Sequence, residues 1–190
     1  MNKRIFLIAF LTACSGVISA LSFDGRFPIP HPGIDTSIGF TISYLSYFIQ
    51  IPGLAFGLAL GIYLKFVERI SFVKVIELVF YSLVAWFVAQ MAGGLVLGTI
   101  LFVSGILGAS IIAVGLRRIV KGLNPIYPII LAGGGAGYLF QLIYAHHFSQ
   151  LQASVPVGSI NYWYLYASFV IWQVIVGVTI AVLINRSRSR

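Results

Sequence analysis

The chain has 190 residues, of which 59% are hydrophobic and 8% charged, and its formal net charge is +8. Soluble domains carry about 25% charged residues, so this composition excludes a water-soluble globular protein, and the length excludes several domains. The basic residues stand in short clusters between long apolar segments, a pattern typical of membrane proteins, so we predict no nucleic-acid partner.

The first apolar segment covers residues 5–22 and follows Lys3 and Arg4. At about 18 residues, it reaches the minimum length for a helix that crosses a bilayer. The residues before Cys14 resemble the cleavage box of a bacterial lipoprotein, so removal of this segment is an alternative. Because the apolar run continues well past Cys14, we favour a retained first helix.

Residues 23–37 are rich in proline, with Pro28, Pro30 and Pro32. Each proline removes a backbone donor, so this stretch is predicted to be a loop of extended character. The loop also concentrates ionisable groups, namely Asp24, Arg26, His31 and Asp35. It is either a solvated loop or a lid over a pocket.

The second predicted helix covers residues 38–64, and a short polar link through Lys74 follows it. As a straight helix it would span about 40 Å, which exceeds a hydrocarbon core of about 30 Å, so we expect a tilt or a kink at Pro52. Residues 75–116 are too long for one crossing. They are predicted to form helices 75–94 and 98–116, with a turn at Gly93-Gly94 to Gly98.

The fifth predicted helix covers residues 125–146, and the sixth covers residues 162–184. A polar loop, residues 148–161, is expected between them. In the fifth helix, Gly133, Gly137, Gln141 and Tyr144 share one face at helical spacing. The glycine part of that face is smooth enough for another helix to pack backbone to backbone.

The predicted fold is therefore all-α: a polytopic integral membrane protein, residues 1–190 forming one transmembrane domain of six helices. The helices pack as one bundle through stripes of small residues. Eleven of the 12 Lys and Arg residues fall on one side of this topology, and only Arg26 falls on the other. The positive-inside rule then places both termini in the cytoplasm, and the protein in the plasma membrane, which is the cytoplasmic membrane in a bacterium.

Polar residues inside the crossings provide the candidate ligand site. Four glutamines come from four different predicted helices: Gln50, Gln90, Gln141 and Gln173. An unpaired amide in hydrocarbon costs several kcal/mol, so each should point into the bundle. The glutamines either fasten helices together or line a cavity that opens to the outer face.

Three residues near the outer face complete the predicted ligand site: Tyr144, His146 and Trp163. The alternative for the rings is the ordinary aromatic belt at headgroup depth. We predict no metal site and no cofactor. The adjacent His146 and His147 diverge by about 100° on a helix, so one helix does not aim both at one metal ion.

No Asp, Glu, Lys or Arg lies in the middle of a predicted crossing, and no phosphate-binding loop is present. Active transport therefore requires a partner that supplies the energy. In size, six crossings and lack of an energy-coupling domain, the chain resembles the substrate-binding subunits of energy-coupling-factor vitamin transporters. This architectural resemblance implies a membrane transport component that binds a small molecule from the outer side.

Two other functions stay open. The chain is alternatively a non-transporting structural or assembly subunit of a larger membrane complex, whose small-residue stripes bind partner helices. The third alternative is a membrane enzyme that acts on a lipid-linked substrate, although no catalytic residues are indicated. The expected partners are the lipid bilayer, a small-molecule ligand and other membrane protein subunits.

Overall fold

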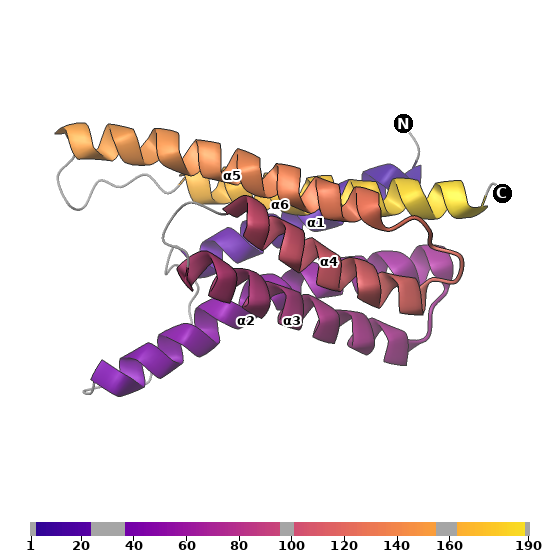
Figure 1. Ribbon diagram of the computed structural model, residues 1–190. Coiled ribbons are helices and arrows are strands. Elements are labelled where there is room, and N and C mark those ends of the chain that lie inside the picture. The colour runs from indigo at the N-terminus through magenta and orange to yellow at the C-terminus, as the bar shows by residue number, and fades with distance from the viewer. Residues whose placement is uncertain (1–2, 24–36, 96–100, 155–162, 189–190) are drawn as a thin grey trace.

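The computed structural model describes residues 3–23, 37–95, 101–154 and 163–188 (Figure 1). The described residues form six helices and no strand, which confirms the predicted all-α fold. The helices are α1 (Lys3–Phe23), α2 (Ser37–Glu68), α3 (Phe72–Leu95), α4 (Leu101–Ile119), α5 (Tyr127–Ser154) and α6 (Trp163–Arg188). The proline-rich segment proposed as a lid lies outside the described residues, apart from Phe23 and Ser37 at the adjoining helix ends.

Five of these helices are long and apolar enough to cross a membrane. The apolar segments are Lys3–Ser22, Ile51–Glu68, Phe72–Ala92, Leu101–Ile119 and Tyr166–Arg188. The apolar part of α5, Tyr127–Ile143, is slightly shorter. A chain with several such helices is a multi-pass membrane protein, because only regular helices satisfy all their backbone hydrogen bonds within a single apolar segment.

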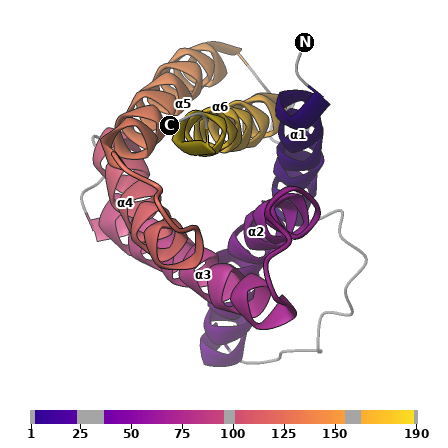
Figure 2. The ribbon, with the colours of Figure 1, turned by 90° about the vertical axis from the view of Figure 1, so that its right-hand side faces the viewer.

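The six helices form a closed ring. Each helix packs mainly against its neighbours in sequence, and α6 closes the ring against α1, as the end-on view shows (Figure 2). A hydrophobic core connects the helices of the ring, and its fully buried members include Leu60, Leu64, Leu116, Ile180 and Ile184. The ring therefore encloses a packed hydrophobic core rather than a pore along its whole length.

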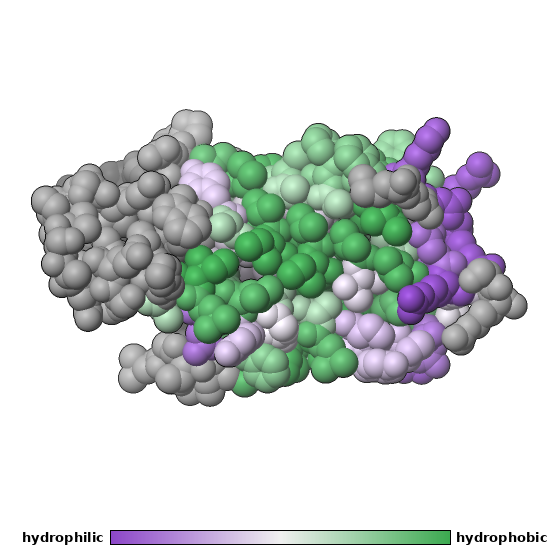
Figure 3. Space-filling view, turned by 90° about the horizontal axis from the view of Figure 1, so that it is seen from above, coloured by the Kyte–Doolittle hydropathy of each residue, from purple (hydrophilic) through white to green (hydrophobic). Residues whose placement is uncertain are grey.

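Charged side chains gather at one end of the ring. The same end holds the start of α1 at Lys3 and the end of α6 at Arg188 (Figures 1 and 3). We call it the charged end. Here Arg188 Nη2 lies 2.7 Å from Glu68 Oε2, which ties α6 to α2. Lys74 Nζ donates to the backbone oxygen of Ile119 at 3.2 Å and so binds the end of α4. Cations at a helix C-terminus also interact favourably with the helix dipole.

The link between α2 and α3 is shorter than predicted. The prediction assigned residues 65–74 to a polar link, whereas only Arg69–Ser71 lie between the helices. Helix-favouring residues prolong α2 to Glu68, and Arg69, with a φ of 53°, ends it in the left-handed conformation. Ser71 Oγ then accepts from the Lys74 backbone N–H at 3.4 Å and caps the start of α3.

The structure also corrects the predicted hairpin turn after α3. Gly93 and Gly94 are helical, because α3 continues to Leu95, and α4 is described from Leu101 onward. In an apolar surrounding a helical glycine keeps its backbone hydrogen bonds satisfied, whereas an early turn exposes them. Residues 96–100, which connect the two helices, lie outside the described part of the chain.

The predicted loop after the fifth helix is wrong for residues 148–154, because α5 continues to Ser154. No glycine or proline interrupts this stretch. The described part of α5 ends at Ser154. In the sequence, Val155 precedes Pro156, and the residue before a proline disfavours the helical conformation. At its other end α5 begins at Tyr127, and Pro128 is tolerated because it lies in the first turn.

α2 is one continuous helix across Pro52. Its first turns project away from the other helices (Figure 1). Its second half packs closely on α3, where a Cβ at Gly57 would lie 2.8 Å from the Cα of Val79 and 2.9 Å from the Ser82 Cβ. Proline removes one internal hydrogen bond and favours a bend, and the predicted tilt or kink at Pro52 stays a prediction.

Candidate functional site

The site is built around Gln173 on α6, whose side chain is 1% exposed. Its amide Nε2 donates to Ser19 Oγ on α1 at 2.8 Å. The Ser19 hydroxyl in turn donates to the backbone oxygen of Ser15 at 2.8 Å. Among the described residues, Gln173 Oε1 has no hydrogen-bond partner although it is buried. Gln173 Oε1 is therefore an available buried acceptor, and the hydroxyls of Ser15 on α1 and Ser168 on α6 are also buried without a partner among the described residues.

Aromatic rings surround the same stretch of α6. Phe169 lies one turn before Gln173 on the same face. Its ring centroid is 5.5 Å from that of Trp86 on α3 and 6.2 Å from that of Phe140 on α5. Both separations lie within the range of favourable ring pairs, and the Phe140 pair is arranged edge to face. Phe169 thus joins three helices.

A second ring contact lies on the other side of Gln173. The Trp172 ring centroid is 5.4 Å from that of Phe56 on α2, and its indole N–H donates to the Gly133 backbone oxygen on α5 at 3.2 Å. We call the five rings the aromatic cluster: Phe56, Trp86, Phe140, Phe169 and Trp172. With Ser19 and Gln173, they bring together side chains from five of the six helices.

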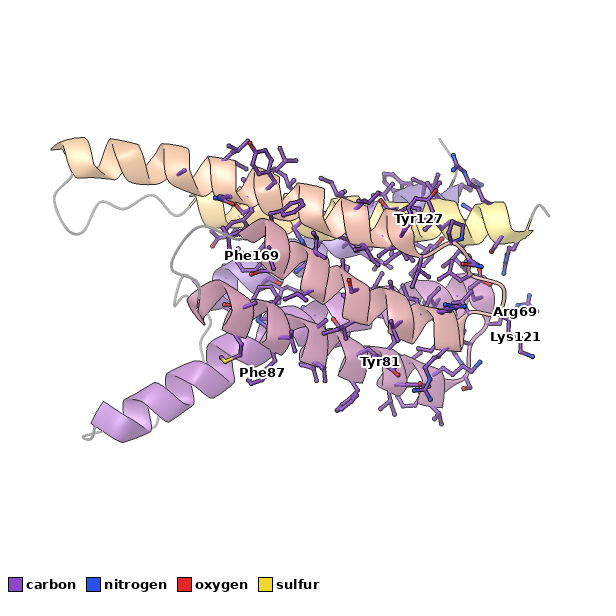
Figure 4. The ribbon with its side chains drawn as sticks, viewed as in Figure 1. Arg69, Tyr81, Phe87, Lys121, Tyr127 and Phe169 are labelled. Atoms are coloured by element: carbon purple, nitrogen blue, oxygen red, sulfur yellow. The ribbon has the colours of Figure 1, made fainter. Side chains whose placement is uncertain are left out.

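The aromatic cluster lies in the half of the ring away from the charged end. Phe169 precedes Arg188 on α6 by a helical length of about 28 Å at 1.5 Å per residue. Figure 4 shows the same separation, with Phe169 near one end and Arg69 and Lys121 at the other. The hydrophobic core between the cluster and the charged end is mostly aliphatic, but it includes Phe56 of the cluster and the fully buried Tyr63, and Trp172 packs against it.

Buried hydroxyls line the α1 side of the site. Thr12, Ser15, Ser19 and Ser22 are all buried on α1. Thr12 Oγ1 donates to the Ile8 backbone oxygen at 2.7 Å, and Ser22 Oγ donates to that of Ser19 at 2.6 Å. The hydroxyls of Thr12, Ser19 and Ser22 are satisfied within their own helix, as is usual for Ser and Thr in a helix. Ser15 Oγ, in contrast, is buried without a hydrogen-bond partner among the described residues.

The predicted glutamines are placed as follows. Gln173 is buried in the site, Gln90 is half-buried one turn after Trp86, and Gln141 is half-buried next to Phe140. Gln141 lies eight residues beyond Gly133, the partner of Trp172, and so about 12 Å further along α5. Gln141 therefore lies at a different level from the Trp172–Gly133 contact.

The other predicted ligand residues are placed only by their backbone. Gln50 lies on α2, Tyr144 and His146 on α5, and Trp163 at the start of α6. Their side chains lie outside the described part of the structure. That the four glutamines line one cavity with these three residues therefore stays a prediction.

Sequence reasoning missed Ser19 and the aromatic cluster. The sequence offered one signal that these rings share a helix face with a glutamine. Phe169 lies one helical turn before Gln173, and Trp86 lies one turn before Gln90. Amide, hydroxyl and aromatic groups bind neutral polar groups and flat apolar surfaces. Among the described residues, no group of three or more His, Cys, Asp or Glu side chains is arranged to hold a metal ion.

Comparison with known proteins finds no family model, no curated protein and no solved structure that matches this chain. What the protein binds has to be inferred from its own residues. The segregation of Gln173 and the aromatic cluster from the charged end is the feature with the greatest bearing on that inference.

Proposed function

We propose that this chain is a small membrane transport component that binds a small molecule in the outer half of its helix ring. The observation that carries the proposal is a buried, unpartnered amide oxygen on the stretch of α6 whose Phe169 and Trp172 contact rings of three other helices. Ligand pockets are mostly apolar and aromatic, with few polar groups that fix orientation. Gln173 beside Phe169 and Trp86 has this composition.

The outer position of the site rests on the orientation of the ring. The described Lys and Arg residues lie at the charged end, together with both helix termini. The positive-inside rule puts that end in the cytoplasm, and a six-helix chain then has both termini there. The aromatic cluster consequently lies in the outer half of a plasma-membrane protein.

Cysteine labelling tests this orientation. In a Cys14→Ala background, Ser71→Cys in the α2–α3 link and Ser187→Cys near the end of α6 are each expected to resist an impermeant maleimide added to intact cells. Both positions lie at the charged end, on the cytoplasmic side of the proposed topology. Both are expected to react once the membrane is permeabilised. Labelling of either position in intact cells would show that the orientation is inverted.

The structure favours an external energy source. Between the charged end and the aromatic cluster, the described helices carry no Asp, Glu, Lys, Arg or His. Carriers driven by protons or ions hold ionisable groups within the membrane. A partner subunit therefore supplies the energy in this proposal, as it does in the transporters that the architecture resembles.

A second candidate function has one specific observation in its favour. Only 22% of the apolar segment of α3 is buried, the lowest share among the five spanning helices. Its outward side chains include Phe80 and Phe87, which are 63% and 47% exposed. Such a face suits lipid or a partner helix. A structural subunit of a larger membrane complex would use it to bind that partner.

Purification in mild detergent separates the two functions. For a transport component, native mass spectrometry is expected to detect a small molecule bound in a one-to-one ratio, and Phe169→Ala should lower its occupancy. Ser110→Ala is the matched control. Ser110 Oγ donates within its own helix, to the Ile106 backbone oxygen on α4 at 2.7 Å. A protein partner in fixed ratio, with no small molecule, would instead support the complex subunit.

A further inference from the structure

The chemistry of the ligand follows from the orientation of one amide. Resting on the proposed function, we infer that the bound molecule has a flat, uncharged body and one N–H or O–H group that donates to Gln173 Oε1. The inference combines the hydrogen bonds of Ser19 with the ring contacts of Phe169. It assigns a ligand class to the site.

The two ends of the Gln173 amide are distinguished by the bonding of Ser19. A serine hydroxyl has one proton, and that of Ser19 is donated to the Ser15 backbone oxygen at 2.8 Å. Ser19 Oγ can therefore only accept from Gln173, so the amide NH₂ faces Ser19 at 2.8 Å. A flipped amide would place two acceptors against each other. The oxygen, not the nitrogen, is left for a ligand.

The unpartnered oxygen selects for a donor. Gln173 Oε1 is buried and has no partner among the described residues. A buried acceptor without a hydrogen bond is costly, and a ligand that donates to it recovers this cost. A ligand that offers only acceptors leaves this oxygen without a hydrogen bond. Sites of this type therefore discriminate strongly against analogues that lack the donor.

The rings beside Gln173 select for a flat body. Phe169 contacts Trp86 and Phe140 at ring separations of 5.5 Å and 6.2 Å, and Trp172 contacts Phe56. Trp86, Phe140 and Trp172 are each half-buried. Aromatic faces and edges pair best with another flat ring. No described carboxylate lies near them to neutralise a cation.

Two matched probes isolate the donor. Benzimidazole has one ring N–H, whereas 1-methylbenzimidazole has the same flat, neutral body without it. Their dissociation constants are measured by ligand-observed NMR on the protein in phosphatidylcholine nanodiscs, with empty nanodiscs as the correction for partition into lipid. We expect benzimidazole to bind at least about tenfold more tightly, because only it pairs with the buried oxygen.

Two variants connect that ratio to Gln173. Gln173→Leu is expected to abolish the preference, so that both probes bind alike. Ser19→Ala retains the glutamine but frees its amide to rotate, and should reduce the preference several-fold while 1-methylbenzimidazole binds as before. Ser110→Ala should leave the ratio unchanged. Unfolding curves in the same nanodiscs identify any variant that fails to fold. If Gln173→Leu fails to fold, the change in probe preference caused by Ser19→Ala tests the inference in its place.

The outcomes that overturn the inference differ from those that overturn the proposed function. Equal affinity for the two probes, no binding of either, or tighter binding of tetramethylammonium would each show that the ligand class is wrong. The transport function would survive any of these if a small molecule co-purifies with the chain. A co-purified protein partner without a small molecule would contradict the proposed transport function, and the inference that rests on it would fail as well.

Discussion

Replacing Gly137 with leucine is expected to lower the free energy of unfolding by about 3 kcal/mol, the upper end of the cost of overpacking a closely packed interior. A Cβ at Gly137 would collide with the backbone oxygen of Leu101 on α4 and lie 3.4 Å from the Gly105 Cα. Backbone atoms cannot rotate away as a side chain does. The two helices therefore have to separate, which also breaks their contact at Gly133.

Gly135 provides the control on the same helix. A Cβ there meets nothing within 4 Å, and the residue is exposed. Gly135→Leu is expected to change the free energy of unfolding by less than about 0.5 kcal/mol, as at other surface positions. Both variants would be unfolded by titration with a denaturing detergent in mixed micelles. Equal losses of stability would show that the α4–α5 contact does not depend on Gly137.

The six helices could be predicted from the sequence because each apolar segment is limited in length by the bilayer. Segment boundaries were less predictable, since local capping decides them. At the α2–α3 link, neither the left-handed Arg69 nor the Ser71 cap is marked by hydropathy. At the end of α5, the polar residues after Phe148 favoured a loop in the sequence, yet nothing before Pro156 breaks a helix.

The candidate site was predictable only in part. Gln173 was identified because an amide is rare within an apolar segment and has to find a partner. Its neighbours Phe169 and Trp86 were not, because both faces of a membrane helix are apolar and hydrophobic periodicity does not mark the inner one. Which ring touches which depends on the order of helices in the closed ring, and no local pattern encodes that order.

Removing the guanidinium of Arg188 is expected to have the second-largest effect, a loss of about 2 kcal/mol in the free energy of unfolding. Arg188 Nη2 lies 2.7 Å from Glu68 Oε2 and also donates to the Val67 backbone oxygen at 3.1 Å. The Glu68 side chain is only 12% exposed, so Arg188→Leu leaves a largely buried carboxylate without its partner. A fully buried broken pair costs about 3 to 5 kcal/mol, and the 41% exposure of Arg188 reduces that figure.

A double-mutant cycle separates the pair from its surroundings. Arg188→Leu combined with Glu68→Leu is expected to recover most of the loss, because the double variant no longer holds an unpaired charge. Arg118→Leu is the control at the same end: its nitrogen lies 3.9 Å from Glu77, and the two side chains are 68% and 37% exposed. Exposed pairs contribute about 0 to 1 kcal/mol. If Arg188→Leu costs no more than Arg118→Leu, the contact with Glu68 does not fasten α6 to α2.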